Sequence, residues 1–217
     1  MSSSFRSLSR SLLTLAAFAA GAAWSQAQIA FNVNVDTSAL TAAPDAPLYL
    51  DFQLNDGTGA GNANNTAVIT GFSFGGGSAL APASTFGGAL GDFGSGVSLV
   101  DSSAFNEFFQ PFLPGTSLSF TVTLSTNVDD PTPDFFGFTI LDSMLANLPT
   151  LSNGTDMFLE VNIDRANPDV FTYASVDGAV SAPTFVPVPE PSTYGLCAAA
   201  GLLLVAAWRR RGLNKRA

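Results

Sequence analysis

Carboxylates are the side chains of this chain that offer the most acid–base and metal chemistry. The sequence contains 17 Asp and Glu residues, no His and a single Cys, Cys197, which lies in an apolar stretch near the C-terminus. These counts exclude a Ser-His-Asp triad, a Cys-His pair and a His-ligated zinc or copper site. Catalysis in the central region would have to rely on carboxylates, hydroxyl groups and one arginine, Arg165.

The acids form two groups that could belong to a site. Asp129, Asp130 and Asp134 share one Pro-rich segment, and Asp51 and Asp56 lie around another turn. Two carboxylates on different loops could act as acid and base on a glycosidic bond. Nothing in their spacing requires that role, and solvated turn residues account for them more simply. We therefore assign no catalytic residue and expect the protein not to be an enzyme.

The same acids could bind Ca²⁺ through their oxygens, as loops at the ends of β-sandwiches often do. The segment Asp51–Gly57 does not fit an EF-hand, because Asp56 stands where that loop needs its glycine. A structural calcium therefore stays a candidate with no assigned ligands, and we expect no other cofactor.

Basic residues are concentrated at the two ends of the chain. Arg165 is the only one between Gln28 and Glu190, where all 17 acids occur, so one positive and 17 negative charges give this region a formal charge of −16. Such a surface repels phosphate backbones, which excludes nucleic acid as a partner. The simplest role of this charge is to keep a protein with 19 Phe residues soluble.

Residues 1–27 have the pattern of a secretory signal peptide. Arg6 and Arg10 precede an apolar stretch, and small residues before Gln28 predict cleavage between Ala27 and Gln28. The apolar stretch is shorter than the ~20 residues that a membrane-spanning helix needs. We therefore expect an exported domain over residues 28–186.

Residues 187–217 combine a short motif, an apolar segment and a basic cluster. The motif consists of Val188, Pro189, Glu190 and Pro191, and the basic cluster of Arg209, Arg210, Arg211, Lys215 and Arg216. The apolar segment between them, 192–208, predicts a transmembrane helix of about 25 Å, the short limit for a bilayer. Because positive charges stay on the cytoplasmic side, this helix would leave the domain outside the membrane.

This order of features resembles the PEP-CTERM sorting signal. The resemblance implies processing by an exosortase, a membrane-embedded enzyme that cuts at or near the Pro-Glu-Pro in Gram-negative bacteria that make extracellular polysaccharide. It further implies a transient membrane anchor, a final place at the cell surface or outside the cell, and an association with exopolysaccharide or biofilm. A plain tail anchor that is never cut is the alternative.

Apolar and polar residues alternate through the central region with the period of two that is typical of half-buried strands. In the clearest run Leu118, Phe120, Val122 and Leu124 alternate with Ser and Thr residues. Further strands are expected over Ile29–Val35, Leu48–Leu54, Met157–Ile163, Ala67–Phe74, Phe135–Leu141 and Val170–Val176. Six or seven strands with at most one helical turn, at Ser143–Leu148, predict an all-β fold, an antiparallel β-sandwich that is Ig-like or jelly-roll-like.

A glycine-rich stretch, Gly71–Gly96, departs from this alternation and is predicted to be a long loop across one end of the sandwich. The phenylalanines that follow are expected to plug the core beneath that loop, with an exposed aromatic patch as the alternative; they are Phe105, Phe108, Phe109 and Phe112. The segments Pro47–Phe52 and Asn106–Phe112 are similar to a group of uncharacterised PEP-CTERM proteins, a resemblance that implies a fold and no chemistry.

These features favour a noncatalytic protein of the cell surface or extracellular matrix. A module that binds a neutral glycan or another protein is the second hypothesis, and a carboxylate-based glycoside hydrolase is the third. Aromatic platforms for sugar are scarce, because only Tyr49 and Tyr173 accompany the phenylalanines of the domain.

Overall fold

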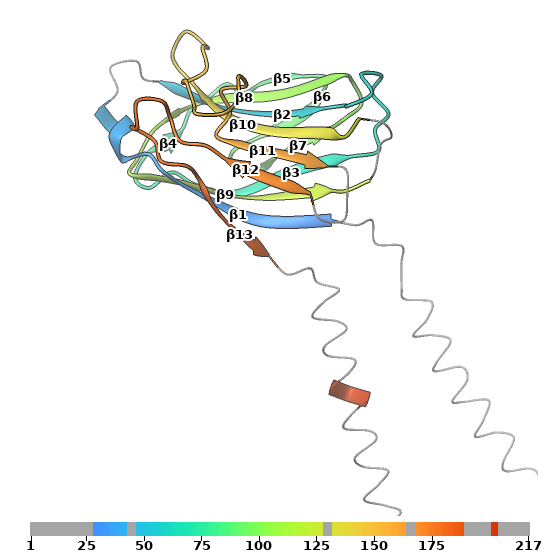
Figure 1. Ribbon diagram of the computed structural model, residues 1–217. Helices are drawn as coiled ribbons and strands as arrows, with labels where there is room; N and C mark the ends of the chain where they lie inside the picture. Colours follow the sequence, from blue (N-terminus) through green and yellow to red (C-terminus); the bar gives the residue numbers. More distant parts are fainter. Residues whose placement is uncertain (1–27, 43–46, 128–131, 164–167, 189–200, 204–217) are drawn as a thin grey trace, which may run out of the picture.

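The computed structural model describes residues 28–42, 47–127, 132–163, 168–188 and 201–203. These residues form two antiparallel sheets packed face to face, so the predicted all-β sandwich is confirmed (Figure 1). The described part contains thirteen strands rather than six or seven, because several of them are short and lack clear alternation.

Each sheet is assembled from strands that are distant in the sequence. Sheet A has the order β13 (Thr184–Val188), β1 (Gln28–Asp36), β9 (Ser117–Ser125), β3 (Thr66–Ser73), β7 (Gly96–Val100) and β6 (Gly88–Asp92). Sheet B has the order β12 (Asp169–Thr172), β11 (Leu159–Ile163), β10 (Asp134–Leu141), β2 (Leu48–Asn55), β8 (Phe105–Leu113) and β4 (Ser78–Ala79), with β5 (Ser84–Phe86) also paired to β8. A 3₁₀ helix, η1 (Ser38–Ala42), follows β1.

The core lies between the two sheets and is built by the alternating residues that the sequence predicted to be buried. Along β9 the even-numbered residues Leu118 to Leu124 are at most 2% exposed, while the intervening Ser and Thr residues lie on the outer face. The same alternation buries Phe31 and Val35 of β1 and one whole face of β2. Removing these apolar side chains from water is the main force that holds the sheets together.

The glycine-rich stretch is not the long loop that its composition predicted. Residues 71–96 contribute the end of β3, all of β4, β5 and β6, and the first residue of β7. Positive φ angles at Gly87 (63°) and Gly91 (108°) show where glycine is needed, since residues with a Cβ rarely adopt them. The glycines therefore permit short, kinked strands at the sheet edges.

The phenylalanines after this stretch do not form a separate plug, because they belong to β8. Phe108 and Phe112 face the core and are at most 1% exposed, whereas Phe105 and Phe109 lie on the outer face of sheet B. The expected helical turn at Ser143–Leu148 is also absent, since these residues form turns and an isolated bridge between Leu141 and Asn147.

The two ends of the sandwich domain lie side by side. β13 pairs with β1 at the edge of sheet A, and Val188 is opposite Ala30. The ring of Phe185 packs against Phe31 at a centroid distance of 6.0 Å, which fastens this edge strand. β13, which ends at Val188, is therefore part of the sandwich.

Most of the two expected targeting segments lies outside the described residues. This holds for residues 1–27, the remainder of the motif from Pro189 on, and the basic cluster; of the apolar segment only Gly201–Leu203 is described, as helix. Among the described residues, no helix is long and apolar enough to cross a membrane.

Candidate functional site

Three inward-facing aspartates close one end of the sandwich core. Each lies two residues along the chain from a buried core residue. Asp56 follows Leu54 of β2, Asp101 follows Leu99 of β7, and Asp134 precedes Phe136 of β10. Successive residues of a strand point to opposite faces, so the alternation that buries the apolar residues also buries these carboxylates. We refer to Asp56, Asp101 and Asp134 as the three-aspartate cluster.

Strand register brings the three carboxylates together. In sheet B, Asn55 pairs with Phe135, so the next position sets Asp56 opposite Asp134. In sheet A, Thr66 pairs with Val100, and the same step sets Asp101 opposite Asn65. The two sheets therefore contribute facing rows of polar side chains at the same end of the core.

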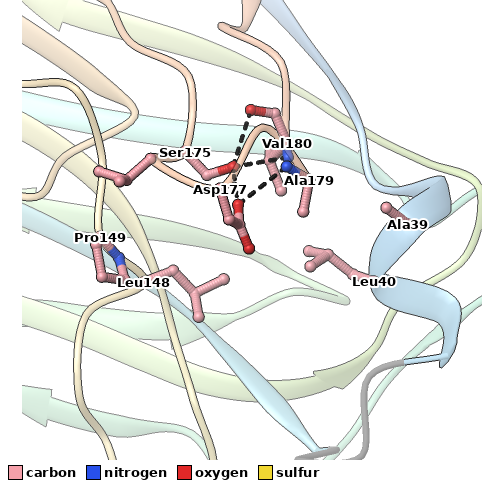
Figure 2. A pocket seen from close by; sticks show the side chains of 9 residues that line it. Ala39, Leu40, Leu148, Pro149, Ser175, Asp177, Ala179 and Val180 are labelled. Carbon is pink, nitrogen blue, oxygen red and sulfur yellow. Dashed lines mark hydrogen bonds between the residues drawn. The ribbon is translucent and has the colours of Figure 1, made fainter.

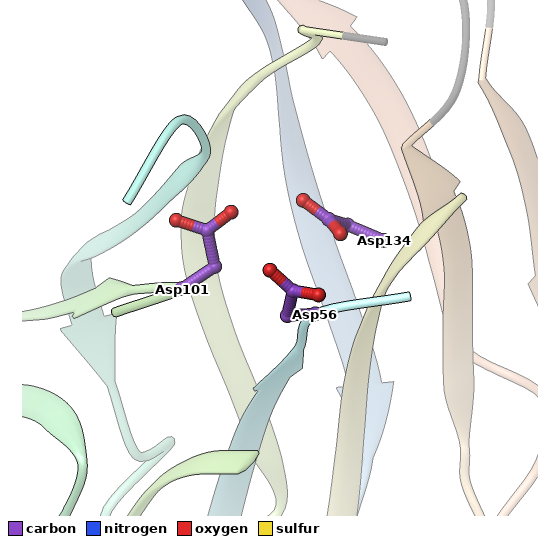
Figure 3. A group of neighbouring side chains, drawn as sticks. All are labelled: Asp56, Asp101 and Asp134. Atoms are coloured by element: carbon purple, nitrogen blue, oxygen red, sulfur yellow. The ribbon is translucent and has the colours of Figure 1, made fainter. Parts of the chain in front are cut away.

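The carboxylates lie close to one another (Figure 3), and all three are buried. One oxygen of each lies within 4.8 Å of an oxygen of the other two. Asp101 and Asp134 are 0% exposed and Asp56 is 6% exposed. Because no Lys, Arg or His occurs in the described residues, no described basic side chain neutralises this group.

Hydrogen bonds fix the orientation of two of the carboxylates. Asp134 accepts from the backbone N–H of Gly57 (2.9 Å) and from Nδ2 of Asn65 (2.7 Å). Oδ1 of Asp56 accepts from Oγ1 of Thr58 (2.6 Å) and the N–H of Gly59 (2.7 Å). Burial acts to raise the pKa of Asp56, but these hydrogen bonds outweigh it and lower that pKa.

Asp101 receives less support than its neighbours. Both of its oxygens accept from the backbone N–H of Asn65, each at 3.1 Å. Burial is the main cause that raises the pKa of Asp101 to about 7, and a hydrogen bond shared with the Asp134 carboxyl is the second cause. Ionisation of Asp101 is therefore disfavoured by its surroundings in the cluster.

Close packing of the loops keeps the cluster rigid. A Cβ on Gly57 would collide with the carbonyl oxygens of Thr132 and Pro133, and one on Gly61, which has a positive φ of 72°, would collide with the backbone of Ser102. Glycine is required at both positions because the backbones touch. The loops that carry the three aspartates thus support one another.

The structure separates the acids that the sequence had grouped. Asp51 and Asp56 point to opposite faces of β2, so only Asp56 reaches the cluster. Asp129 and Asp130 lie outside the described residues, as does Arg165. Sequence reasoning missed Asp101, although its position two residues after the buried Leu99 marks it as inward-facing.

Asp51 is a second buried carboxyl, on the outer face of sheet B. It is 1% exposed, accepts a hydrogen bond from Nε2 of Gln53 (2.7 Å), and leaves Oδ1 without a partner among the described residues. Burial, partly offset by the Gln53 hydrogen bond, raises its pKa to about 7. Glu107 nearby has a raised pKa for the same reason, burial.

We predict that Asp51→Asn removes the contribution of one titrating carboxyl group to the pH dependence of the unfolding free energy. Between pH 4 and 7 the folded state keeps Asp51 protonated while the unfolded state does not, so wild-type stability falls as pH rises through this window and levels off above it. In the variant the unfolding free energy, measured by urea denaturation between about pH 5 and 6.5, falls less steeply with rising pH than in the wild type. The difference in slope is about 1.4 kcal/mol per pH unit.

Asp36→Asn is the matched control, because Asp36 is exposed and its hydrogen bonds with Ser38 lower its pKa. It titrates below this window and leaves the slope unchanged. An unchanged slope in Asp51→Asn would show that Asp51 is ionised in the folded protein across the window.

An apolar pocket lies beside η1 (Figure 2). It has a volume of about 380 Å³ and is lined by Leu40, Leu148, Pro149 and Val180, with Asp177 as its one titratable side chain. Asp177 accepts hydrogen bonds from Ser175 Oγ (2.6 Å) and the N–H of Ala179 (2.9 Å), which lower its pKa. Ser175 also lines the pocket, and its Oγ is further bonded to the backbone of Val180, donating to the carbonyl oxygen (3.3 Å) and accepting from the N–H (2.9 Å).

A shallow, uncharged groove crosses the outer face of sheet A. It has a volume of about 310 Å³ and is lined by Asn32, Asn34, Ser119, Thr121 and the edge-strand residue Val186. Oγ1 of Thr121 donates to Oδ1 of Asn32 over 2.7 Å, so the two strands present a fixed row of amide and hydroxyl groups. Such groups exchange hydrogen bonds readily with neutral polar ligands.

The comparisons with known proteins identify the C-terminal sorting motif and no relative of the sandwich domain. The family model for the PEP-CTERM protein-sorting motif matches residues 187–211. No curated protein and no solved structure matches the chain. The match begins within β13, directly where the sandwich ends, and it covers the expected motif and the first part of the basic cluster. The chain therefore carries a PEP-CTERM sorting motif, which indicates an exported protein that is targeted to exosortase and implies a transient membrane anchor.

Proposed function

We propose that the chain is a noncatalytic protein of the cell surface or extracellular matrix that associates with exopolysaccharide. The observation that carries this proposal is the sorting motif joined without a linker to a β-sandwich: the family match starts at residue 187, and β13 ends at Val188. Exosortase processing after this strand would release or display a complete sandwich.

The placement of the carboxylates supports a noncatalytic role. The acids that come together are 0% to 6% exposed, so a glycosidic bond has no path to them. General acid–base catalysis needs a group within hydrogen-bond reach of the substrate. Asp51 is closed off in the same way at 1% exposure.

The groove on sheet A supports binding to a neutral region of polysaccharide. Its lining is uncharged although the domain as a whole is strongly acidic, so it is a place where a sugar chain avoids charge repulsion. Amide and hydroxyl groups at fixed spacing can exchange hydrogen bonds with sugar hydroxyls. This surface is also the physical basis of the second hypothesis, a glycan-binding module.

We predict that the processed protein, purified from its own cells, sediments with exopolysaccharide isolated from the same host. The double variant Asn32→Ala, Thr121→Val removes the two hydrogen-bonding groups at the centre of the groove. It lowers the affinity for the polysaccharide at least about fivefold, because each lost hydrogen bond contributes about 0.5–1.5 kcal/mol. The control Asn162→Ala, on sheet B, leaves binding unchanged.

The same protein is assayed for release of reducing sugar from that polysaccharide, and we expect no release above buffer. Absence of co-sedimentation would refute the association, and release of sugar would refute the noncatalytic role. Equal binding by wild type and the double variant would show that the polysaccharide binds to a surface other than the groove.

A further inference from the structure

We propose that the three-aspartate cluster is a calcium site that locks one end of the sandwich. Asp56 and Asp134 from sheet B and Asp101 from sheet A would each supply one carboxylate oxygen. The site would join the two sheets and three loops that the sequence keeps far apart.

The spacing of the oxygens fits a calcium ion. Ca²⁺ binds oxygen ligands at about 2.3–2.6 Å, so two ligands of one ion lie at most about 5 Å apart. The three oxygens, which all lie within 4.8 Å of one another, satisfy this limit without any rearrangement of the backbone.

A buried polar atom aimed into the cluster points to a missing ligand. Oδ2 of Asp56 has no hydrogen-bond partner among the described residues, although Asp56 is only 6% exposed. Its side chain faces the other two carboxylates (Figure 3). Leaving a charged oxygen buried and unpaired is costly. A cation at the centre of the cluster would satisfy it.

Thr126 gives independent support from sheet A. Its Oγ1 also has no partner among the described residues, and the side chain is 5% exposed. The β3–β9 register pairs Ala67 with Leu124, so two residues further on Thr126 stands opposite Asn65, and Asn65 in turn stands opposite Asp101 on its other side. The inner layer of sheet A at this end of the core therefore holds a second oxygen without a partner among the described residues.

The donor set selects a hard cation. Carboxylate and hydroxyl oxygens bind Ca²⁺ or Mg²⁺ in preference to soft metals, and the described residues contain no thiol or imidazole. Mg²⁺ keeps several water molecules and needs strict octahedral geometry, whereas Ca²⁺ tolerates irregular protein ligands. Carboxylates that are at most 6% exposed leave little room for retained water, which favours Ca²⁺.

The test is calcium titration of the full-length chain, purified in detergent and stripped with EGTA. We expect one binding event by isothermal titration calorimetry, with a Kd in the range of about 10⁻⁵ to 10⁻³ M that is common for exported modules. At 100 times Kd, CaCl₂ should raise the Tm by about 5–10 °C, and MgCl₂ at the same concentration should raise it less.

Asp56→Asn provides the sharpest variant. The amide oxygen keeps the hydrogen bonds from Thr58 and Gly59, while the amide nitrogen replaces Oδ2 and can donate to the facing carboxylates. The metal-free Tm should therefore stay equal to wild type or rise, while calcium affinity falls at least tenfold. Asp101→Asn should lose the calcium response in the same way, and Asp36→Asn at the opposite end should keep it.

Each outcome decides the matter. A wild-type Tm and heat signal that do not respond to millimolar CaCl₂ would overturn the proposal and leave a cluster neutralised by protons alone. Calcium binding that persists unchanged in Asp56→Asn and Asp101→Asn would overturn it as well, because the ion would then lie elsewhere.

Discussion

Replacing Pro189, Glu190 and Pro191 together with alanine should abolish removal of the C-terminal tail in cells that contain exosortase. Wild-type protein from these cells should lack the segment after the cut, whereas the triple variant should keep every residue to Ala217. Proline disfavours a helical backbone at the residue before it and has no N–H donor, so we expect exosortase to accept this segment as an extended strand. Intact-mass measurement distinguishes the two forms, because retained arginines and the apolar segment add a discrete mass.

The structure explains why this cut would leave the domain folded. The last described pair of β13 and β1 joins Val188 to Ala30, so the described sandwich reaches the residue directly before Pro189. The control Ser192→Ala, Thr193→Ala alters the adjacent residues and should be processed like wild type. A triple variant with the wild-type mass would show that exosortase reads another feature, and a wild-type chain that keeps its tail would mark an uncut anchor.

The long strands were predictable from sequence because each buries one face. In Leu118–Leu124 the period of two separates apolar from hydroxyl side chains, and only a half-buried strand uses both faces in this way. The short strands around Gly88 carry no such pattern, since glycine has no side chain to bury. They form because Gly88–Asp92 pairs with Gly96–Val100, and tertiary pairing of this kind overrides local propensity.

Only part of the candidate calcium site could be predicted from the sequence: the inward orientation of its residues, but not their meeting. Alternation alone identifies Asp56 and Asp101 as inward-facing, since each follows a buried leucine by two residues. Their meeting depends on the register of β2 with β10 and on how sheet A lies over sheet B, and neither is written in local patterns. Proximity in sequence was misleading, because it grouped Asp56 with Asp51 on the opposite face.

Phe52→Ala should cause a large loss of stability. Phe52 is 0% exposed, and its ring lies 5.2 Å from Phe138 of its own sheet and 5.3 Å from Phe120 of the facing sheet. Further ring contacts with Phe72 (6.0 Å) and Phe136 (6.4 Å) surround it. Truncation leaves a cavity between the sheets and should lower the unfolding free energy by about 3–5 kcal/mol.

Thermal denaturation measures this effect, and for a domain of this size the loss corresponds to a Tm lower by about 6–20 °C. Phe86→Ala is the matched control: the same atoms are removed from a side chain that is 60% exposed and contacts one ring, Phe105, so the Tm should change by no more than about 2–3 °C. Phe52→Leu should recover most of the loss, because it refills much of the cavity. Equal losses in Phe52→Ala and Phe86→Ala would contradict a core centred between the two sheets, since burial would then no longer decide the cost of removing a ring.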